Sequence, residues 1–318
     1  MRRFRRLTTL AFVLLAGLLT PVTAAEAHGD PGSIAITEQA SRRILVLPAT
    51  RAAWTGAKPS WAWAPSATNG LGDLARAWTN PDEAKLATRD GRKYLLTTAS
   101  GGFAAVVPYP EGNTAYWAAD VEARNNPHSI ELLPDGNVAV AASTGGWVRI
   151  YTASQGARST TFAEFPLTGA HGVVWDAERN VLWVLGTHEL VALKVTGTAA
   201  APKLTAVRTF ALPTEGGHDL QPVPGRADLL WLTTETRVYQ FGKDSGQFSR
   251  RYRGSGEIDR PDVKSVTTSP ATGRVLTASV QPGHVCTWCT DTVDLALPHG
   301  KLTLRGAWIY KARWWPGA

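Results

Sequence analysis

Three histidines and two lysines recur along this sequence at nearly constant spacing. They are Lys85, His128, His171, His218 and Lys264, and successive members lie 43, 43, 47 and 46 residues apart. Neutral imidazole is a common metal ligand, and protonated imidazole and ammonium groups donate hydrogen bonds to anions and hydroxyl oxygens. Brought together, the five would form a site for an acidic or hydroxyl-rich ligand. His128, His171 and His218 would be the candidate metal ligands.

The same spacing also has a structural interpretation, because polar residues near a buried axis satisfy backbone groups there, often through water. A metal site is more demanding, since His–metal bonds are about 2.0–2.1 Å long. Three imidazoles from neighbouring units of a ring must come very close to share one ion. The sequence therefore leaves three interpretations open: a structural set, an anion-binding polar ring and a metal site.

Each of the five residues marks one copy of an internal repeat. The copy at His128 reads HSIELLPDGNVAVA, the copy at His171 reads HGVVWDAERNVLWV, and a third begins at His218. In each copy a short strand ends in a turn of Asp, Gly, Pro or Asn, and a β-branched or Leu-rich strand follows. We expect these second strands at 137–142, 181–185, 229–233 and 274–278.

The remainder of each copy predicts two further strands. Third strands are expected at 147–151, 189–195 and 237–241, and more polar fourth strands at 159–165, 203–212 and 247–253. Four strands in about 45 residues are typical of one blade of a β-propeller. No segment carries a sustained helical period, so the predicted fold is all-β.

The number of copies predicts a single six-bladed β-propeller with four-stranded blades. Residues 32–48 are interpreted as an inner hairpin of the first blade, and the five copies supply the other five blades. Seven blades are the alternative, because Lys311 lies 47 residues after Lys264. We expect the last strand, 308–315, to pair with the first blade and close the ring, which removes an exposed sheet edge.

Residues 1–27 are predicted to be a secretory signal peptide, and residues 28–318 the propeller domain. Several arginines precede an apolar run at 10–19, and Ala25-Glu26-Ala27 resembles a cleavage site. The run is shorter than the roughly 20 residues that span a bilayer. Removing the leader takes away four Arg and one Glu, which leaves 29 basic and 25 acidic residues, a net charge of +4. We expect an extracellular monomer with no membrane span and no nucleic-acid partner.

The two cysteines, Cys286 and Cys289, lie three residues apart. In an exported chain such a pair is expected to form a local disulfide. His284 and His299 flank the pair, so a four-ligand zinc site is the alternative.

The chain contains thirteen tryptophans. Four of them, Trp54, Trp61, Trp63 and Trp78, lie in the connection between the first two predicted blades. Aromatic rings in such a connection can stack on sugars or pack between blades.

The run from Asn126 to Val138, NPHSIELLPDGNV, resembles a family of secreted six-bladed β-propeller-like proteins with no assigned biochemical function. Supporting segments are EQASRRI at 38–44, WAWAP at 61–65, TASGG at 98–102 and YKARW at 310–314. The resemblance covers nearly all of the chain after the leader. It implies the fold and export, and it assigns no catalytic residue. More broadly, the chain is similar to lactonase and lyase propellers in fold only.

The leading functional hypothesis is a binding module whose ligand occupies the channel mouth, near the five recurring residues. An acidic or hydroxyl-rich small ligand or glycan suits imidazole and ammonium donors. One alternative is a metal-assisted polysaccharide lyase or hydrolase, in which the imidazoles hold a divalent metal ion and a lysine acts as base. The other is an extracellular protein-interaction scaffold that uses a propeller face and has no small-molecule site.

Overall fold

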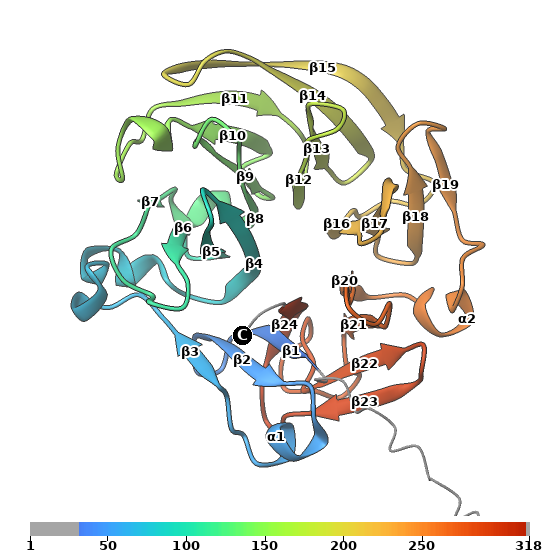
Figure 1. Cartoon of the computed structure of the whole chain (residues 1–318). Helices are drawn as coiled ribbons and strands as arrows, with labels where there is room; N and C mark the ends of the chain where they lie inside the picture. Colours follow the sequence, from blue (N-terminus) through green and yellow to red (C-terminus); the bar gives the residue numbers. More distant parts are fainter. Residues whose placement is uncertain (1–31, 316–318) are drawn as a thin grey trace, which may run out of the picture. The chain divides into compact units, whose positions relative to one another are not determined.

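The strands of the described chain form a ring of blades. A computed structural model describes residues 32–315, so the predicted signal peptide of residues 1–27 lies outside the described residues. Within 32–315, twenty-four strands form six four-stranded antiparallel sheets arranged as a β-propeller (Figure 1). The prediction of an all-β, six-bladed fold is confirmed, and the seven-bladed alternative is wrong.

The first three blades contain the following strands, in order from the axis outward. Blade 1 comprises β24 (Ile309–Trp315), β1 (Ser33–Glu38), β2 (Arg43–Pro48) and β3 (Trp61–Trp63). Blade 2 comprises β4 (Pro81–Arg89), β5 (Arg92–Ala99), β6 (Phe103–Pro108) and β7 (Trp117–Asp120). Blade 3 comprises β8 (Pro127–Leu132), β9 (Val138–Ala142), β10 (Trp147–Tyr151) and β11 (Phe162–Pro166).

The other three blades follow the same order. Blade 4 comprises β12 (Gly172–Asp176), β13 (Val181–Leu185), β14 (Glu189–Thr198) and β15 (Ala201–Ala211). Blade 5 comprises β16 (Asp219–Val223), β17 (Arg226–Thr233), β18 (Val238–Gly242) and β19 (Gln247–Ser249). Blade 6 comprises β20 (Val263–Thr268), β21 (Val275–Ser279), β22 (Thr292–Ala296) and β23 (Gly300–Thr303).

Helices in the described chain are short. They are α1 (Arg51–Thr55), α2 (Ser255–Ile258) and the 3-10 turns η1 (Ala67–Asn69), η2 (Gly72–Ala77), η3 (Ala123–Asn125) and η4 (Ala153–Gln155). None of the helices between residues 32 and 315 has the length and apolar character needed to cross a membrane.

The predicted second and third strands agree with the structure to within three residues. β13 and β10 have the predicted bounds, whereas β17 begins three residues before the predicted 229. The fourth strand of blade 5 is shorter than predicted, because β19 ends at Ser249 rather than at 253. The apolar runs were therefore more accurate guides to strand bounds than the polar outer segments.

The ends of the described chain meet in blade 1. β24 pairs antiparallel with β1, with Ser33 opposite Trp315 and Ile34 opposite Trp314. The expected closure by the last strand is confirmed, and it leaves no open edge between the ends. One detail of the prediction is wrong: β24 is the innermost strand, so residues 32–48 supply the second and third strands of blade 1 rather than an inner hairpin.

Apolar side chains packed between neighbouring blades form the core. Between blades 3 and 4, for example, Ala139 and Ala141 pack in one cluster with Val173 and Leu182, and all four are fully buried. The second strands are buried along their whole length, as in β13, which reads VLWVL. Burial of each such Val or Leu side chain stabilises the folded state by about 1.5–3 kcal/mol relative to leaving it exposed to water.

Tryptophans of the connection between blades 1 and 2 belong to this core. Trp54, Trp63 and Trp78 are at most 5% exposed. Trp63 and Trp78 pack edge to face, with their ring centroids 5.4 Å apart. The structure thus supports the packing interpretation for these three rings and not the sugar-stacking one.

Candidate functional site

The innermost strands begin with a shared backbone feature. In five of the six described blades, one residue with a left-handed backbone lies shortly before or at the start of the strand. These residues are Asn80, Asn126, Gly169, Gly216 and Asp262, with φ between 52° and 78°. Gly, Asn and Asp are the residue types that adopt this conformation most readily. The turn directs the side chain two residues later toward the axis.

These five side chains and Tyr310 of β24 form a ring at the end of the channel where the innermost strands begin. We call it the mouth ring, and its six members are Asp82, His128, His171, His218, Lys264 and Tyr310. They line a cavity of about 270 Å³, which we call the mouth pocket, together with Gln39, Asn80, Ser100, Asn126 and Trp288. This volume lies near the lower limit for small-molecule sites, about 300 Å³. The pocket suits a ligand of a single small unit.

The structure brings the three predicted histidines together. The ring centroids of His128 and His171 are 4.4 Å apart, and those of His171 and His218 are 5.0 Å apart with nearly parallel planes. In each case Nδ1 donates to the carbonyl oxygen two residues earlier, at 2.9, 2.8 and 3.0 Å in chain order. This fixes the tautomer, because Nε2 is then an acceptor. The left-handed turn therefore both aims the imidazole and supplies its hydrogen-bond partner.

The Nε2 atoms differ in what they contact. His218 Nε2 accepts a hydrogen bond from Lys264 Nζ at 2.7 Å. Among residues 32–315, no side chain or backbone group bonds to Nε2 of His128 or His171. Two imidazole acceptors are thus left for a ligand, next to a histidine–lysine pair.

Burial shifts every titratable group of the mouth ring toward its uncharged form. It lowers the pKa of His128 and His218 well below the usual value, and it lowers the pKa of His171 to about 4. Neighbouring imidazoles and lysines act in the same direction, since they disfavour further positive charge. The three imidazoles are therefore neutral acceptors at pH 7.

Burial also shifts the pKa of the other three members of the mouth ring toward their uncharged forms. Burial lowers the pKa of Lys264 and raises the pKa of Tyr310 and Asp82, the last two well above their usual values. Ser100 Oγ donates to Asp82 Oδ2 at 2.8 Å, which offsets part of the burial effect. Burial therefore opposes charge on every titratable group of this polar pocket.

Lys85 and Lys311 lie outside the mouth pocket, unlike the histidines and Lys264. Lys85 Nζ donates to the carbonyl oxygen of Val173 at 2.6 Å and lies 3.5 Å from Glu131 Oε2. Lys85 does not line the mouth pocket, so its expected place beside the histidines is wrong; Asp82, three residues earlier, occupies that place. Lys264 lies where it was expected, and Tyr310 rather than Lys311 completes the ring.

A second ring of charges lies one residue further along several of the same strands. We call Glu83, Asp219, Lys311 and Arg313 the buried charged layer. Arg313 binds both carboxylates, reaching Glu83 at 3.1 Å and Asp219 at 2.6 and 2.9 Å. Lys311 Nζ lies 3.3 Å from Glu83 and 3.7 Å from Asp219. All four side chains are at most 5% exposed, so these residues span the channel beneath the mouth pocket.

The pairing in this layer outweighs the effect of burial on Glu83. Burial raises the pKa of Glu83, but Arg313 and Lys311 lower it by more than burial raises it, and the resulting pKa is about 2. The layer carries two negative and two positive side chains, and its charges balance. It therefore requires no bound ion.

Two groups of candidate metal ligands differ in how closely their donor atoms lie together. The donor atoms of His128, His171 and His218 do not all lie within 4.8 Å of one another, whereas those of His284, Cys286 and Cys289 do. Within residues 32–315, this second group is the only one of three or more His, Cys, Asp or Glu residues that meets that distance. The mouth histidines are thus arranged less closely than one shared ion requires.

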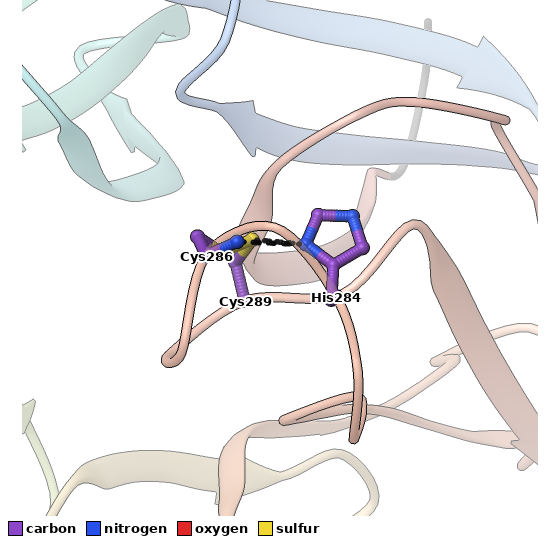
Figure 2. A group of neighbouring side chains, drawn as sticks. All are labelled: His284, Cys286 and Cys289. Atoms are coloured by element: carbon purple, nitrogen blue, oxygen red, sulfur yellow. Dashed lines mark hydrogen bonds between the residues drawn. A yellow bond between two sulfur atoms is a disulfide. The ribbon is translucent and has the colours of Figure 1, made fainter.

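The two cysteines form a disulfide, with their Cα atoms 5.7 Å apart. His284 Nδ1 lies 3.2 Å from Cys289 Sγ and accepts from the backbone N–H of Cys286 at 3.3 Å (Figure 2). His299 is elsewhere, with its Nδ1 3.6 Å from Glu257. The structure therefore has the expected disulfide and does not assemble the four-ligand zinc set. The same three residues could hold a metal only with the disulfide reduced.

Sequence reasoning missed several residues of the mouth pocket, among them Asp82, Tyr310 and Trp288. A signal for the first was present, because Asn80-Pro81-Asp82 matches Asn126-Pro127-His128 residue for residue around the proline. For Tyr310 the spacing of 46 residues from Lys264 equals that between His218 and Lys264. For Trp288 no repeat position gives a signal, since it lies in a loop.

Several solved structures are similar to this chain. Virginiamycin B lyase from Staphylococcus aureus has 10% sequence identity and a TM-score of 0.45, covering 69% of this chain and 68% of that one. A streptogramin B lyase has 12% identity and a TM-score of 0.46, covering 71% and 69%. Sqt1 from Saccharomyces cerevisiae has 14% identity and a TM-score of 0.43, covering 64% and 57%. Likeness at this level carries no argument about ligand or activity.

No protein of curated function matches the chain in sequence. The resemblance inferred from the repeat is confirmed by a family model that matches residues 26–316, nearly the whole chain. The chain belongs to the Family of unknown function (DUF6528).

Proposed function

We propose that the mouth pocket binds a small hydroxyl-rich ligand, such as one sugar unit. The observation that carries this proposal is the pair of neutral imidazole acceptors, His128 Nε2 and His171 Nε2, which have no partner among the described residues. Hydroxyl groups are donors and acceptors at once, so they complement these atoms and the neighbouring Lys264 and Tyr310. Asn126 Oδ1, on another residue of the pocket lining, is buried without a partner among the described residues, and such a group favours a ligand or ordered water at this place.

A hydroxyl-rich ligand fits better than an acidic one. The depressed pKa values of the three histidines mean that an anion would meet neutral rings, with Lys264 as the nearest cation. The strong cations beneath, Lys311 and Arg313, are already paired with Glu83 and Asp219. A carboxylate would therefore have to raise the pKa of an imidazole in order to bind strongly.

The proposal is tested by calorimetric titration of the purified protein with glucose, galactose, glucuronate and glycerol. We expect a neutral sugar to bind best at pH 7. His171→Ala should weaken binding about three- to tenfold, the value of one neutral hydrogen bond. His188→Ala is the matched control, because His188 is an exposed histidine of the same blade, outside the mouth pocket. Removing His128, His171 and His218 together should abolish binding.

The same titrations separate the alternatives. Failure of every probe to bind the folded protein contradicts the proposal, as does unchanged binding by the triple variant. Binding of glucuronate alone, strengthened at pH 5, would favour an acidic ligand instead. Binding that disappears with a chelator and returns with a divalent ion would favour the metal-assisted lyase or hydrolase.

We propose in addition that the protein acts outside the cytoplasm. The Cys286–Cys289 disulfide supports this, because such bonds persist in oxidising compartments. The predicted leader of residues 1–27 leads us to expect a secreted product that begins near His28. Intact-mass measurement of the protein recovered outside the cell tests this, and a product that retains Arg2 to Arg6 would contradict it.

A further inference from the structure

The mouth pocket has an aromatic rim that the repeat does not supply. Trp288 lines the pocket and is 43% exposed. The sequence has thirteen tryptophans, all within the described residues, and Trp288 is the single exposed one. An indole left in water forfeits the favourable free energy of burying its large apolar face. Its exposure beside a polar pocket requires an explanation.

The loop that carries Trp288 is held in place at its base. It spans residues 280–291 between β21 and β22, and Trp288 lies in the sequence between Cys286 and Cys289, which form the disulfide. Thr290 and Ile309 exchange two backbone hydrogen bonds, at 3.1 and 2.8 Å. Ile309 directly precedes Tyr310, so the loop is fastened next to a member of the mouth ring.

The indole itself is also oriented. Trp288 Nε1–H donates to Gln39 Oε1 at 2.9 Å, and Gln39 Nε2 donates to Asp82 Oδ1 at 3.4 Å. This chain connects blade 6 to blade 2 across the turn between β1 and β2 of blade 1. The polar edge of the indole is therefore engaged by protein, while 43% of the residue's surface remains exposed.

A fixed aromatic face next to hydroxyl-binding groups selects for one shape of ligand. A pyranose ring has hydroxyls at its edge and a face of C–H bonds, so it can use both features at once. An acyclic alditol has the same hydroxyl groups but no rigid C–H face. An inorganic anion has neither.

We propose that the mouth pocket takes a pyranose sugar whose C–H face stacks on the indole of Trp288, with its hydroxyls on the mouth ring. This rests on the proposed function above, and it names the class of ligand and the residue that selects it. The Cys286–Cys289 disulfide is a positioning element, since it holds the short loop on which the indole is presented.

The experiment compares methyl β-glucopyranoside and methyl β-galactopyranoside with glucitol, by calorimetry and by tryptophan fluorescence. We expect the wild-type protein to prefer at least one pyranoside to glucitol. Trp288→Ala should lower the pyranoside affinity about tenfold, as for the loss of an aromatic contact, and leave glucitol unchanged. Trp288→Phe should retain most of the affinity, because the aromatic face remains. Phe162→Ala is the matched control, since Phe162 is another exposed aromatic residue, at 41%, on β11 and outside the mouth pocket.

Replacing both cysteines, Cys286→Ser with Cys289→Ser, tests the positioning role. We expect a weaker pyranoside affinity with an unchanged glucitol affinity, and a normal thermal transition shows that the propeller is intact. Equal binding of pyranosides and glucitol, or an unchanged pyranoside affinity in Trp288→Ala, overturns this inference while the proposed function stands. If neither probe binds the wild-type protein, both are overturned.

Discussion

The mouth ring and the buried charged layer are neighbours on the same strands, yet they are opposite in character. Asp82 and Glu83 are consecutive in β4, and burial raises the pKa of the first while paired cations lower the pKa of the second to about 2. In β24, burial raises the pKa of Tyr310, whereas the adjacent Lys311 pairs with Glu83 and Asp219. In the mouth ring, burial disfavours the charged forms and two acceptors lack partners; in the buried charged layer, all four side chains are paired with opposite charges.

This difference separates a layer that organises the ring from a layer that is available to a ligand. Arg313 of blade 1 reaches carboxylates of blades 2 and 5, so it ties distant blades across the axis. In contrast, the imidazoles of the mouth ring bond to carbonyls of their own turns. A change in the lower layer should therefore affect the whole fold, and a change in the upper layer should affect mainly the site.

The largest effect is expected from breaking the lower layer. Arg313→Met leaves Lys311 as the only cation of the layer that pairs with Glu83 and Asp219. Glu83→Gln leaves Lys311 and Arg313 with Asp219 as the only carboxylate of the layer. Removing one member of a buried ionic network costs about 3–5 kcal/mol, because the remaining charges are desolvated and unpaired. We expect each variant to lower the free energy of unfolding by that amount in urea denaturation at pH 7.

The matched change in the upper layer is Lys264→Met, which also replaces a cationic side chain by methionine. It removes one hydrogen bond to His218 and leaves no unpaired charge, so the expected cost is about 1 kcal/mol or less. Equal costs for Arg313→Met and Lys264→Met would show that the two layers do not differ as described.

A second, smaller effect distinguishes the layers by pH. The pKa of His171 is about 4 in the folded protein and about 6.5 when unfolded, so unfolding takes up protons below pH 6.5. Its contribution is fully present above pH 6.5 and is lost as the pH falls toward 4. By pH 5 the loss is about 2 kcal/mol from His171 alone. The stabilising contribution of Glu83 is lost in a lower pH range, as the pH falls from about 4.5 to 2.

Comparison with His171→Asn isolates this contribution, because the amide can replace the Nδ1–H donor to Gly169 without titrating. We expect the variant to lose about 2 kcal/mol less than the wild type between pH 7 and pH 5 in urea denaturation. Identical pH profiles would contradict a depressed pKa at His171.

Much of this arrangement could be predicted from the repeat. The alternation of turns and apolar runs predicted six blades, and the three histidines coincide because each follows a turn residue at an equivalent position. The disulfide was predicted from the spacing of Cys286 and Cys289. Periodic burial and local turn chemistry are properties of short segments, which is why the sequence carries them.

Other features could not be predicted from the spacing of the recurring residues. In the copy that contains Lys85 this spacing selected the wrong residue, because Pro81 and Pro127 precede the same register shift in β4 and β8, which makes Asp82 the equivalent of His128. The pairing of Arg313 with Asp219 joins residues 94 positions apart across the axis. No local pattern encodes such a contact, nor the place of Trp288 over the mouth.

The smallest expected loss of stability is that of Asp82→Asn, which tests the neighbour of Glu83. Because burial raises the pKa of Asp82, folding disfavours its ionised form, so an amide of nearly the same shape should cost the fold less than about 1 kcal/mol at pH 7 or should stabilise it. Asn can still accept from Gln39 through Oδ1 and donate to Ser100 through Nδ2.

Since the folded pKa is raised, the contribution of Asp82 is fully present below its unfolded pKa and is lost as the pH rises through the folded value. The wild type should therefore gain stability relative to the variant as the pH falls in urea denaturation. A cost equal to that of Glu83→Gln would mean that Asp82 is ionised and paired like its neighbour, and the contrast between the two layers would fail at its most direct point.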